Sequence, residues 1–492
     1  MLSRILSLFS SEETPVAAPA GMRVVPCSAL DVGARDVVMT IGLAIDARLD
    51  PQILEQSLST LIERKFPRAG ARLAFRNDAY EFHIPCTFDS HNPPIAFTAQ
   101  QYREPYQSPT RPDISALVNL SDSEPVACRF PSLEKYLMSK TCPTSTYGFL
   151  TSNTPMVHVH VSVFDDLTFI GVTSSQMMFD VVGTRTLLHA WTRLLAGEDI
   201  DAIQGMEWDV TPFECFQGTS SMGCVRGYSY QCSPALLGLA LDDYQWLRSL
   251  LRDREECKLI RVPKAFLEDR RLKIMGDLKR QGSTECIQFS DVLLAWWFKT
   301  SYGLRRSNDT TRVYIHLPVD LRPKRIFPGG SALTAPYINN ASSTVALEVI
   351  AAGAFQNESL DELALRIRRT TTAYDAGLLM IQNELVWRNA DRLTPIFRGI
   401  PIRGDESELQ TNWCDARLSG LDFSGARTLG SEYKGRGRVL LVLANTMLAA
   451  EYMSLRGHGA ILMEDENAIW MSQVKSRKEW KDLGLSGHLK FI

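Results

Sequence analysis

The chain has 492 residues, of which 45% are hydrophobic and 22% are charged, and its formal net charge is -3. This length predicts two domains, and the composition is typical of a soluble globular protein. Because positive and negative charges nearly balance, no broad basic surface is expected, which argues against nucleic acid as a partner. No apolar run approaches the roughly 18 residues of a membrane span, so no span is expected either.

The first 20 residues (1–20) are expected to form a flexible tail. Their apolar patch is interrupted by Arg4 and followed by acidic residues, so it is too short for a secretory signal, and a weak amphipathic anchor is the alternative. Ten cysteines extend from Cys27 to Cys414 without a C-x-x-C pair or a zinc-ligand pattern. Free thiols in a reducing compartment explain this usage, so we expect a cytoplasmic protein without a metal site.

The first predicted elements alternate between strand and helix. Residues 37–47 (VVMTIGLAIDA) form a continuous apolar run that predicts a strand. Residues 51–65 place their aliphatic side chains on one helical face, and Asp50 is a suitable N-cap. A short strand is expected at 78–84. These elements open an N-terminal α/β domain that we expect to cover residues 21–205.

The clearest local element is a β-hairpin with strands at 156–164 and 167–175. The first strand alternates strictly, with valines on one face and His158 and His160 on the other. The second strand ends in two serines. A helix at 183–196 follows, and its leucines and tryptophan share one face, which should cover the sheet.

From residue 206 to residue 234 the pattern dissolves into Gly, Ser, Cys and aromatic residues, which predicts a crossover between two domains. The C-terminal domain is expected at 235–492. Its predicted helices lie at 241–254, 290–302 and 360–383, and its predicted strands at 312–319, 439–444 and 460–463. Mixed helices and strands in both halves predict an α/β fold of two sandwich-like domains of similar size.

Four blocks of sequence, in order along the chain, resemble the BAHD family, the coenzyme A-dependent acyltransferases of plant and fungal specialised metabolism. The blocks are LEQSLSTLIERKFPRAGARL at 54–73, VTSSQMMFDVVGTRTLLHAW at 172–191, LPVDLRPK at 317–324 with PYINNASSTV at 336–345, and LDFSGARTLG at 421–430. The resemblance implies the chloramphenicol-acetyltransferase-like fold, with two domains around a central channel. It also implies that acyl-CoA is the co-substrate and a small molecule the acceptor. We expect a monomer with no bound cofactor.

The block at 172–191 departs from the family pattern at its most important position. Gln176 stands where the family has the histidine that deprotonates the acceptor, and an amide cannot be a general base. Asp180 is retained four residues later. The resemblance implies that Asp180 is turned from the channel and braces the loop, so that it belongs with Gly183 to the structural motif.

The block at 421–430 also departs from the family pattern. It keeps Asp422 and Phe423 but continues with Ser-Gly-Ala where the family has Gly-Trp-Gly. The resemblance places this loop on the coenzyme side, which makes Ser424 and Gly425 the cofactor-binding candidates. An ion pair between Asp422 and Arg322 would hold the loop, and an unpaired surface aspartate is the alternative.

Another histidine could replace the missing base. His158 and His160 are the catalytic candidates beside Gln176, because their strand runs antiparallel to the one that ends at Gln176; a satisfied core or surface histidine is the alternative. His189 is expected to be a packing residue, and His316 could also point inward. The sequence contains no nucleophile elbow, Walker motif or Rossmann glycine pattern.

Three functions fit these residues. The first is acyl transfer from acyl-CoA to a hydroxyl or amine of a small molecule in fungal specialised metabolism, with Gln176 orienting the acceptor or stabilising the oxyanion. The second is a cyclase or isomerase that polarises a carbonyl in the same channel without acyl-CoA. The third is a non-catalytic small-molecule binding protein on the same fold.

Overall fold

The computed structural model describes residues 19–35, 37–77, 79–120, 123–216, 254–388, 405–428, 433, 435–448 and 454–492. The tail expected at 1–20 lies outside the described residues except for its last two positions. The same holds for the helix expected at 241–254 except for its last residue, and for the crossover from residue 217 onward. Within the described part, no helix has both the length and the apolar character needed to cross a bilayer.

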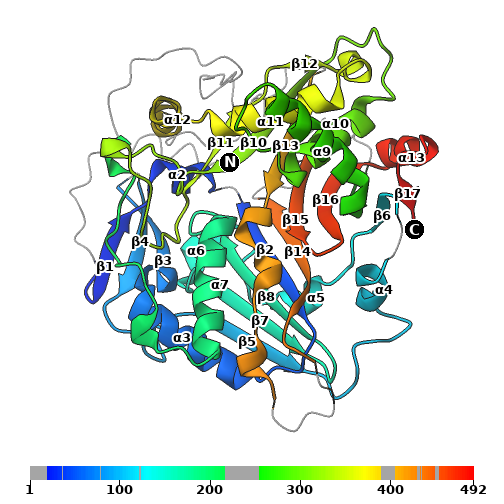
Figure 1. Cartoon of the computed structure of the whole chain (residues 1–492). Coiled ribbons are helices and arrows are strands. Elements are labelled where there is room, and N and C mark those ends of the chain that lie inside the picture. Colours follow the sequence, from blue (N-terminus) through cyan, green and yellow to red (C-terminus); the bar gives the residue numbers. More distant parts are fainter. Residues whose placement is uncertain are drawn as a thin grey trace, which may run out of the picture.

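One of the two large sheets has five strands in the order β14-β2-β8-β7-β5. Neighbouring strands are antiparallel except for β5 and β7, which are parallel. The strands are β2 (Val37–Ile45), β5 (Ala96–Gln101), β7 (His158–Val163), β8 (Thr168–Ser175) and β14 (Val439–Leu448). The helices α3 (Pro51–Lys65) and α7 (Val181–Leu195) contact each other in front of this sheet in Figure 1, and Trp191 Nε1 of α7 donates to Ser57 Oγ of α3 at 2.8 Å.

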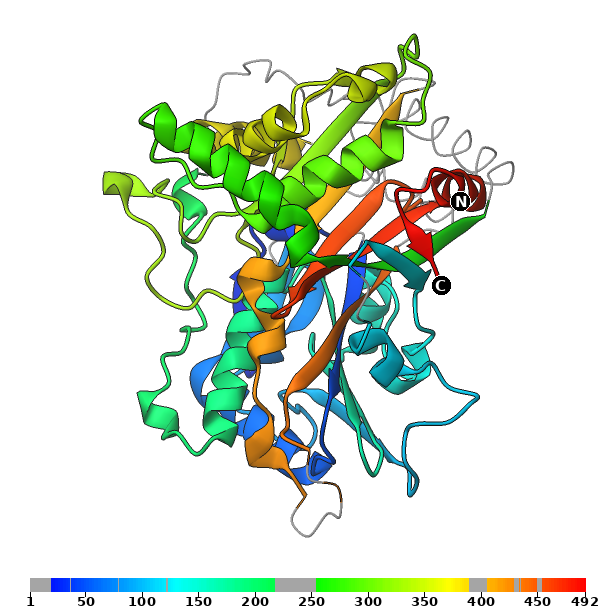
Figure 2. The same cartoon turned by 45° about the vertical axis from the view of Figure 1, so that its right-hand side comes forward.

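The second large sheet has the order β11-β10-β13-β15-β16-β9-β6-β17, with β12 paired to β10. Its strands are β6 (Val126–Arg129), β9 (Glu255–Pro263), β10 (Arg312–Asp320), β11 (Ser342–Ala346), β12 (Ile350–Ala351), β13 (Glu406–Asn412), β15 (His458–Glu464), β16 (Ala468–Ser476) and β17 (Lys490–Phe491). The helices α9 (Lys264–Arg280), α10 (Phe289–Tyr302) and α11 (Leu360–Thr372) cover its upper face in Figure 2, and the five-stranded sheet lies below it. Because α10 lies between other elements, most of its residues are buried.

A third sheet and several short helices complete the described part. The small sheet has the order β1-β4-β3, with β1 (Met22–Pro26), β3 (Arg72–Arg76) and β4 (Ala79–Pro85). The remaining helices are α2 (Ala29–Gly33), α4 (Ile114–Val118), α5 (Glu134–Leu137), α6 (Thr146–Ser152), α12 (Ala376–Arg388) and α13 (Arg477–Leu485).

The two large sheets exchange strands between the halves of the chain. β14, from the C-terminal half, pairs with β2 over nine residue pairs and forms the edge of the five-stranded sheet. β6, from the N-terminal half, pairs with β9 in the nine-stranded sheet. The domain bounds at 21–205 and 235–492 stay a prediction, and strand pairing crosses them at these two places and also where β17 pairs with β6.

Most elements expected from periodicity are present where the sequence places them. The helix at 51–65 is α3, the hairpin is β7 and β8, and the helix at 183–196 is α7. The single helix expected at 360–383 is wrong, since α11 ends at Thr372 and α12 begins at Ala376. The hydroxyls of Thr371 and Thr372 bond back to the carbonyl of Arg368, which competes with helix continuation.

Candidate functional site

Gln176 follows the last residue of β8, at the end of the five-stranded sheet. Its backbone N–H donates to Val37 O at 2.8 Å, and its carbonyl accepts from Asn340 Nδ2 at 2.6 Å. The side-chain Nε2 lies 3.4 Å from the sulfur of Met39, which is a weak acceptor. The backbone of Gln176 is therefore fixed from both halves of the chain, while its amide has only a weak partner among the described residues.

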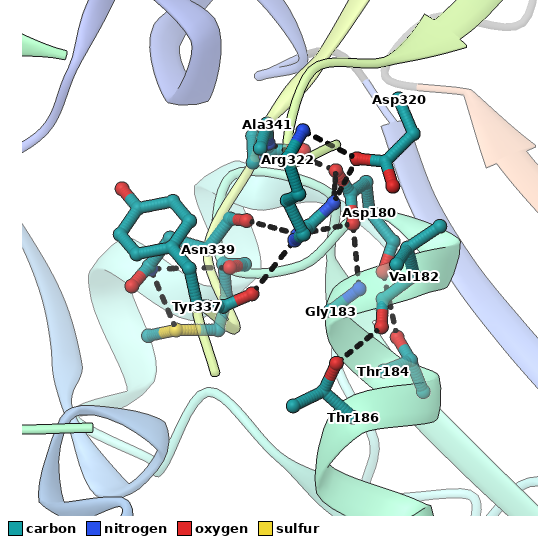
Figure 3. Close-up of polar contacts among 12 residues, drawn as sticks. Asp180, Val182, Gly183, Thr184, Thr186, Asp320, Arg322, Tyr337, Asn339 and Ala341 are labelled. Carbon is teal, nitrogen blue, oxygen red and sulfur yellow. Dashed lines mark hydrogen bonds and ion pairs between the residues drawn. The ribbon is translucent and has the colours of Figure 1, made fainter. Parts of the chain in front are cut away.

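Asp180 is the N-cap of α7 (Figure 3). Its Oδ1 accepts from the Gly183 N–H at 2.7 Å, and its Oδ2 accepts from the Ala341 N–H at 2.9 Å. The side chain of Thr184 also donates to the Asp180 carbonyl at 3.0 Å. One carboxylate thus satisfies backbone donors of the helix and of a segment from the other half.

Arg322 is the charged partner of Asp180 (Figure 3). Its two terminal nitrogens lie 2.8 and 3.1 Å from the two Asp180 oxygens, and Nη1 lies 2.8 Å from Asp320 Oδ1. Burial alone would lower the pKa of Arg322, but the charges of Asp180 and Asp320 outweigh it and raise the pKa. The pair expected between Arg322 and Asp422 is therefore wrong, because Arg322 binds Asp180 from the other half of the chain and Asp320 from its own. Asp422 is exposed, and its Oδ1 accepts from the Ser424 N–H at 2.8 Å.

The segment after Tyr337 holds the loop between Gln176 and Asp180 from the C-terminal half. Asn339 Nδ2 donates to Met178 O at 3.1 Å, and Asn340 Nδ2 donates to Met177 O at 3.0 Å. Both asparagines are almost fully buried. The same Nδ2 of Asn340 lies 3.2 Å from Asp31 Oδ1, so a buried acid is part of this support.

A cavity of about 700 Å³ is lined by residues of both large sheets and of the elements between them. From the five-stranded side it is lined by Val37, Met39 and Gln176. Strands β13, β15 and β16 of the nine-stranded sheet line it as well. Asp180 also reaches its wall, while Arg322 does not line it. This cavity is the candidate active site, and Gln176 is one of its polar groups.

The histidines expected to act with Gln176 do not line this cavity. The ring of His158 lies 3.0 Å from Thr154 Oγ1, and the ring of His160 lies 2.8 Å from Thr98 Oγ1. Burial lowers the pKa of His158 to about 4, against the raising effect of a hydrogen bond that its ring donates to the Pro155 carbonyl, and burial also lowers the pKa of His160. Both are buried, hydrogen-bonded histidines outside this cavity, as the alternative of a satisfied histidine describes, and their catalytic role stays a prediction.

The loop at 422–425 lies away from the cavity, against the C-terminal end of α7. Phe423 is fully buried and meets the Trp191 ring edge-on, with centroids 5.4 Å apart. A Cβ at Gly425 would lie 1.7 Å from Leu195 O, so only glycine fits there. Neither Ser424 nor Gly425 lines this cavity, and their expected cofactor-binding role stays a prediction. Their place is set by packing on α7.

The cavity wall also contains two groups that the sequence interpretation missed. His458, at the start of β15, lines the cavity and is partly buried. Asp291, in the first turn of α10, lines it too, and burial raises its pKa to about 6 against the lowering effects of Gln288 and Arg368. The sequence marks His458 only as a polar residue between two glycines before a predicted strand, which is a weak signal. Among the described residues, no group of three or more His, Cys, Asp or Glu side chains could hold a metal ion.

Comparison with known proteins gives relatives along most of the chain. No model of a protein family matches it. The acetyltransferase adrJ of Penicillium roqueforti is 27% identical over 413 residues, which cover 80% of this chain and 79% of the relative. The transcriptional regulator calD of Penicillium decumbens is 24% identical over 412 residues, with the same shares of 80% and 79%.

The fold has solved counterparts. The crystal structure of F. graminearum TRI101 with coenzyme A and deoxynivalenol has a TM-score of 0.64 to this chain at 14% identity, and the match covers 94% of this chain and 97% of TRI101. The chain has the two-domain acyltransferase fold. This confirms the expected fold class, the chloramphenicol-acetyltransferase-like α/β fold of the BAHD enzymes. The relatives and the structures together support an acyltransferase.

In this acyltransferase fold Gln176 supplies hydrogen-bond donors to the cavity. The side-chain amide has two N–H donors and no titratable proton near neutral pH. It can therefore orient a carbonyl or stabilise an oxyanion, but it cannot accept a proton from an acceptor hydroxyl. A proton acceptor for that chemistry has to come from another residue or from the substrate.

Proposed function

We propose that this chain is an acyltransferase of fungal specialised metabolism that transfers an acyl group from acyl-CoA to a hydroxyl or amine of a small molecule. The observation that carries this proposal is the cavity of about 700 Å³ that both large sheets line, with Gln176 in its wall. Support comes from the fold, because the TRI101 structure with the same fold contains coenzyme A and deoxynivalenol. The adrJ relative is named an acetyltransferase, which agrees with this activity.

In this proposal Gln176 takes the place of the family's motif histidine and stabilises charge instead of moving a proton. Its amide has only the sulfur of Met39 as a partner among the described residues, so an N–H remains for a thioester oxygen. A single donor to an oxyanion typically contributes about 10²–10³-fold to kcat. The role of Gln176 is therefore to position the acyl group and stabilise the tetrahedral intermediate.

The retained motif residues are proposed to be structural. Asp180 caps α7 and binds Arg322, and both residues hold the loop that follows β8 and carries Gln176. Gly183 allows the first turn of α7 to lie against the carbonyl of Ile338. Asp422 lies on the surface, and its loop packs on α7 through the buried neighbour Phe423. Asp180 and Gly183 therefore support the cavity, and none of these residues takes part in the chemistry.

A second candidate is cyclisation or isomerisation in the same cavity without acyl-CoA. It is favoured by one observation, the amide at Gln176, because such reactions need shape and a hydrogen-bond donor more than a base. In that case acyl-CoA would be neither bound nor required. The two candidates are separated by the coenzyme requirement.

The test uses the purified full chain with acetyl-CoA. Binding is measured by calorimetry, and free coenzyme A and acetylated products are measured by mass spectrometry with a panel of small hydroxyl- and amine-bearing acceptors. We expect saturable binding of acetyl-CoA and coenzyme A release that depends on the protein. The exposed substitution Asp422→Ala is the control and should behave as wild type, whereas Gln176→Ala should lower release. Absence of acetyl-CoA binding, with conversion of a small molecule that ignores acyl-CoA, would contradict acyl transfer.

A further inference from the structure

Acyl transfer to a hydroxyl needs a group that accepts the hydroxyl proton, and Gln176 cannot supply it. The chain has eight histidines, and all of them lie in the described residues. His458 is the one that lines the cavity of Gln176. Resting on the function proposed above, we propose that His458 is the general base of acyl transfer to hydroxyl acceptors.

The register of β15 places the His458 side chain on the cavity face of the nine-stranded sheet. The next residue, Gly459, faces the opposite side, since a Cβ there would lie 2.2–2.3 Å from the side-chain amides of Gln410 and Gln473. Successive residues of a strand point to opposite faces, so His458 points away from those amides. Its partner on β13 is Leu409, and Leu409 and Val474 of β16 line the cavity with it.

The sheet around His458 is fixed from behind by a buried polar cluster. Glu408 Oε1 lies 3.1 Å from Lys475 Nζ and accepts from the Tyr302 hydroxyl at 2.9 Å. Gln410 Nε2 donates to Glu408 Oε2 at 2.9 Å and to Gln473 Oε1 at 3.1 Å. Since these groups are satisfied and buried, the backbone that carries His458 is held on a rigid element, as a positioned base requires.

Gln176 lines the same cavity from the five-stranded side. Its N–H bonds to Val37, which pairs with Leu448 at the end of β14. Val37, Leu448 and Gln176 all line the cavity, and β15 contacts β14. The donor on the five-stranded side and the imidazole on the nine-stranded side therefore face one shared space.

Three buried or partly buried carboxylates of the cavity wall, Asp180, Asp291 and Asp320, are occupied by structural contacts, while Glu134 and Asp415 are exposed. Asp180 and Asp320 both bind Arg322. Asp291 accepts from the Gln288 N–H at 2.9 Å and completes the capping box of α10. A base that must take up and release a proton in each turnover is better served by an imidazole than by these held carboxylates.

The proposed step balances in protons and bonds. His458 takes the proton of the acceptor hydroxyl while the hydroxyl oxygen forms a bond to the carbonyl carbon of the thioester. An N–H of Gln176 stabilises the oxyanion that results. The intermediate then collapses, the carbon–sulfur bond breaks, and the imidazolium returns the proton to the leaving thiolate. The products are the ester and free coenzyme A, and His458 is neutral again.

The test compares two nucleophiles with acetyl-CoA as donor and the purified full chain. Water is the hydroxyl acceptor and needs a base, whereas hydroxylamine attacks as a neutral amine and does not. Free coenzyme A and acetohydroxamate are measured after subtraction of the reaction without protein. We expect His458→Gln to lower hydrolysis about 10²–10⁴-fold and to leave transfer to hydroxylamine within a few-fold of wild type. The exposed histidine variant His488→Gln is the matched control and should change neither rate.

A second variant keeps the test decisive if His458→Gln is poorly folded. His458→Ala leaves a space in the cavity wall, so added imidazole should restore hydrolysis in this variant and not in Gln176→Ala. Equal hydrolysis by wild type and both His458 variants would overturn the base role. Loss of both reactions with intact acetyl-CoA binding would overturn it too, because His458 would then position the donor. If the wild type binds no acetyl-CoA and transfers to neither nucleophile, the proposed function itself fails.

Discussion

Arg322 holds both carboxylate oxygens of Asp180 across the two halves of the chain, at 2.8 and 3.1 Å. The same arginine donates to the carbonyls of Tyr337 and Asn339, at 2.9 and 2.8 Å. The loop from Gln176 to Asp180 is therefore bound to residues 337–341 of the C-terminal half. The geometry of the cavity depends on this buried ion pair.

Asp180→Ala should destabilise the protein strongly. Both partners are only 11% exposed, and removing one member of a buried pair typically costs about 3–5 kcal/mol because the other charge stays buried. The free energy of unfolding is measured by urea denaturation. Asp422→Ala, at an exposed aspartate, is the control and should cost less than about 1 kcal/mol. A similar small loss for both variants would show that the pair does not hold the halves together.

Gly183→Ala should be destabilising although alanine favours helices. A Cβ at this position would lie 1.9 Å from Ile338 O, so the first turn of α7 would have to move. Gly276→Ala is the matched control in α9, where the nearest atom is 3.7 Å away in a flexible arginine side chain. That change should stabilise by about 0.5–1 kcal/mol. We expect the melting temperature of Gly183→Ala to fall and that of Gly276→Ala to rise. A change of both melting temperatures in the same direction would contradict this prediction.

The free energy of unfolding should fall as the pH rises from about 4 to about 6, because of Asp31. Burial raises its pKa from 3.8 to about 6, against the lowering effect of hydrogen bonds from Ser28 and Asn340. The folded state therefore keeps a proton that the unfolded chain has released, and this contribution is lost as the pH rises through the folded pKa. A shift of about two units corresponds to about 3 kcal/mol. Asp31→Asn should remove this dependence, as seen in urea denaturation at several pH values, and parallel curves for both proteins would refute the assignment.

Variants of Gln176 distinguish acyl transfer from cyclisation. Gln176→Ala should lower kcat for acetyl transfer about 10²–10³-fold through loss of the oxyanion donor. Gln176→His should keep transfer to hydroxyls, since an imidazole N–H can donate as well. A cyclase would be slowed by the same substitution, because the ring differs from the amide in shape and in its donors. The measurement is product formation with and without acyl-CoA by wild type and both variants.

The sequence predicted elements well where one local pattern determines them. The strict alternation before Gln176 and the apolar face of the helix at 51–65 are local features, and both elements are present. The break between α11 and α12 depends on hydroxyls that bond back to Arg368, and the apolar period continues across it. A hydrophobic pattern alone therefore joins two helices that hydrogen bonding separates.

The site was predictable in part for a related reason. Gln176, Asp180 and Arg322 lie in blocks that resemble one family, so their proximity could be expected, although Arg322 was assigned to the wrong aspartate. His458 could not be found in this way, because its place in the cavity depends on the register of β15 against β13 and β16. Such pairing between distant strands has no signal in the residues near His458.

The exchanged strands make each half of the chain incomplete without the other. β2 lies between β8 and β14, so removal of the C-terminal half would expose a nine-residue edge whose side chains are nearly all buried. Exposed apolar edges of this length pair readily with other chains. A cut in the crossover should therefore yield fragments that aggregate when they are made separately and reassemble when they are made together. The two halves would then fold only as one unit.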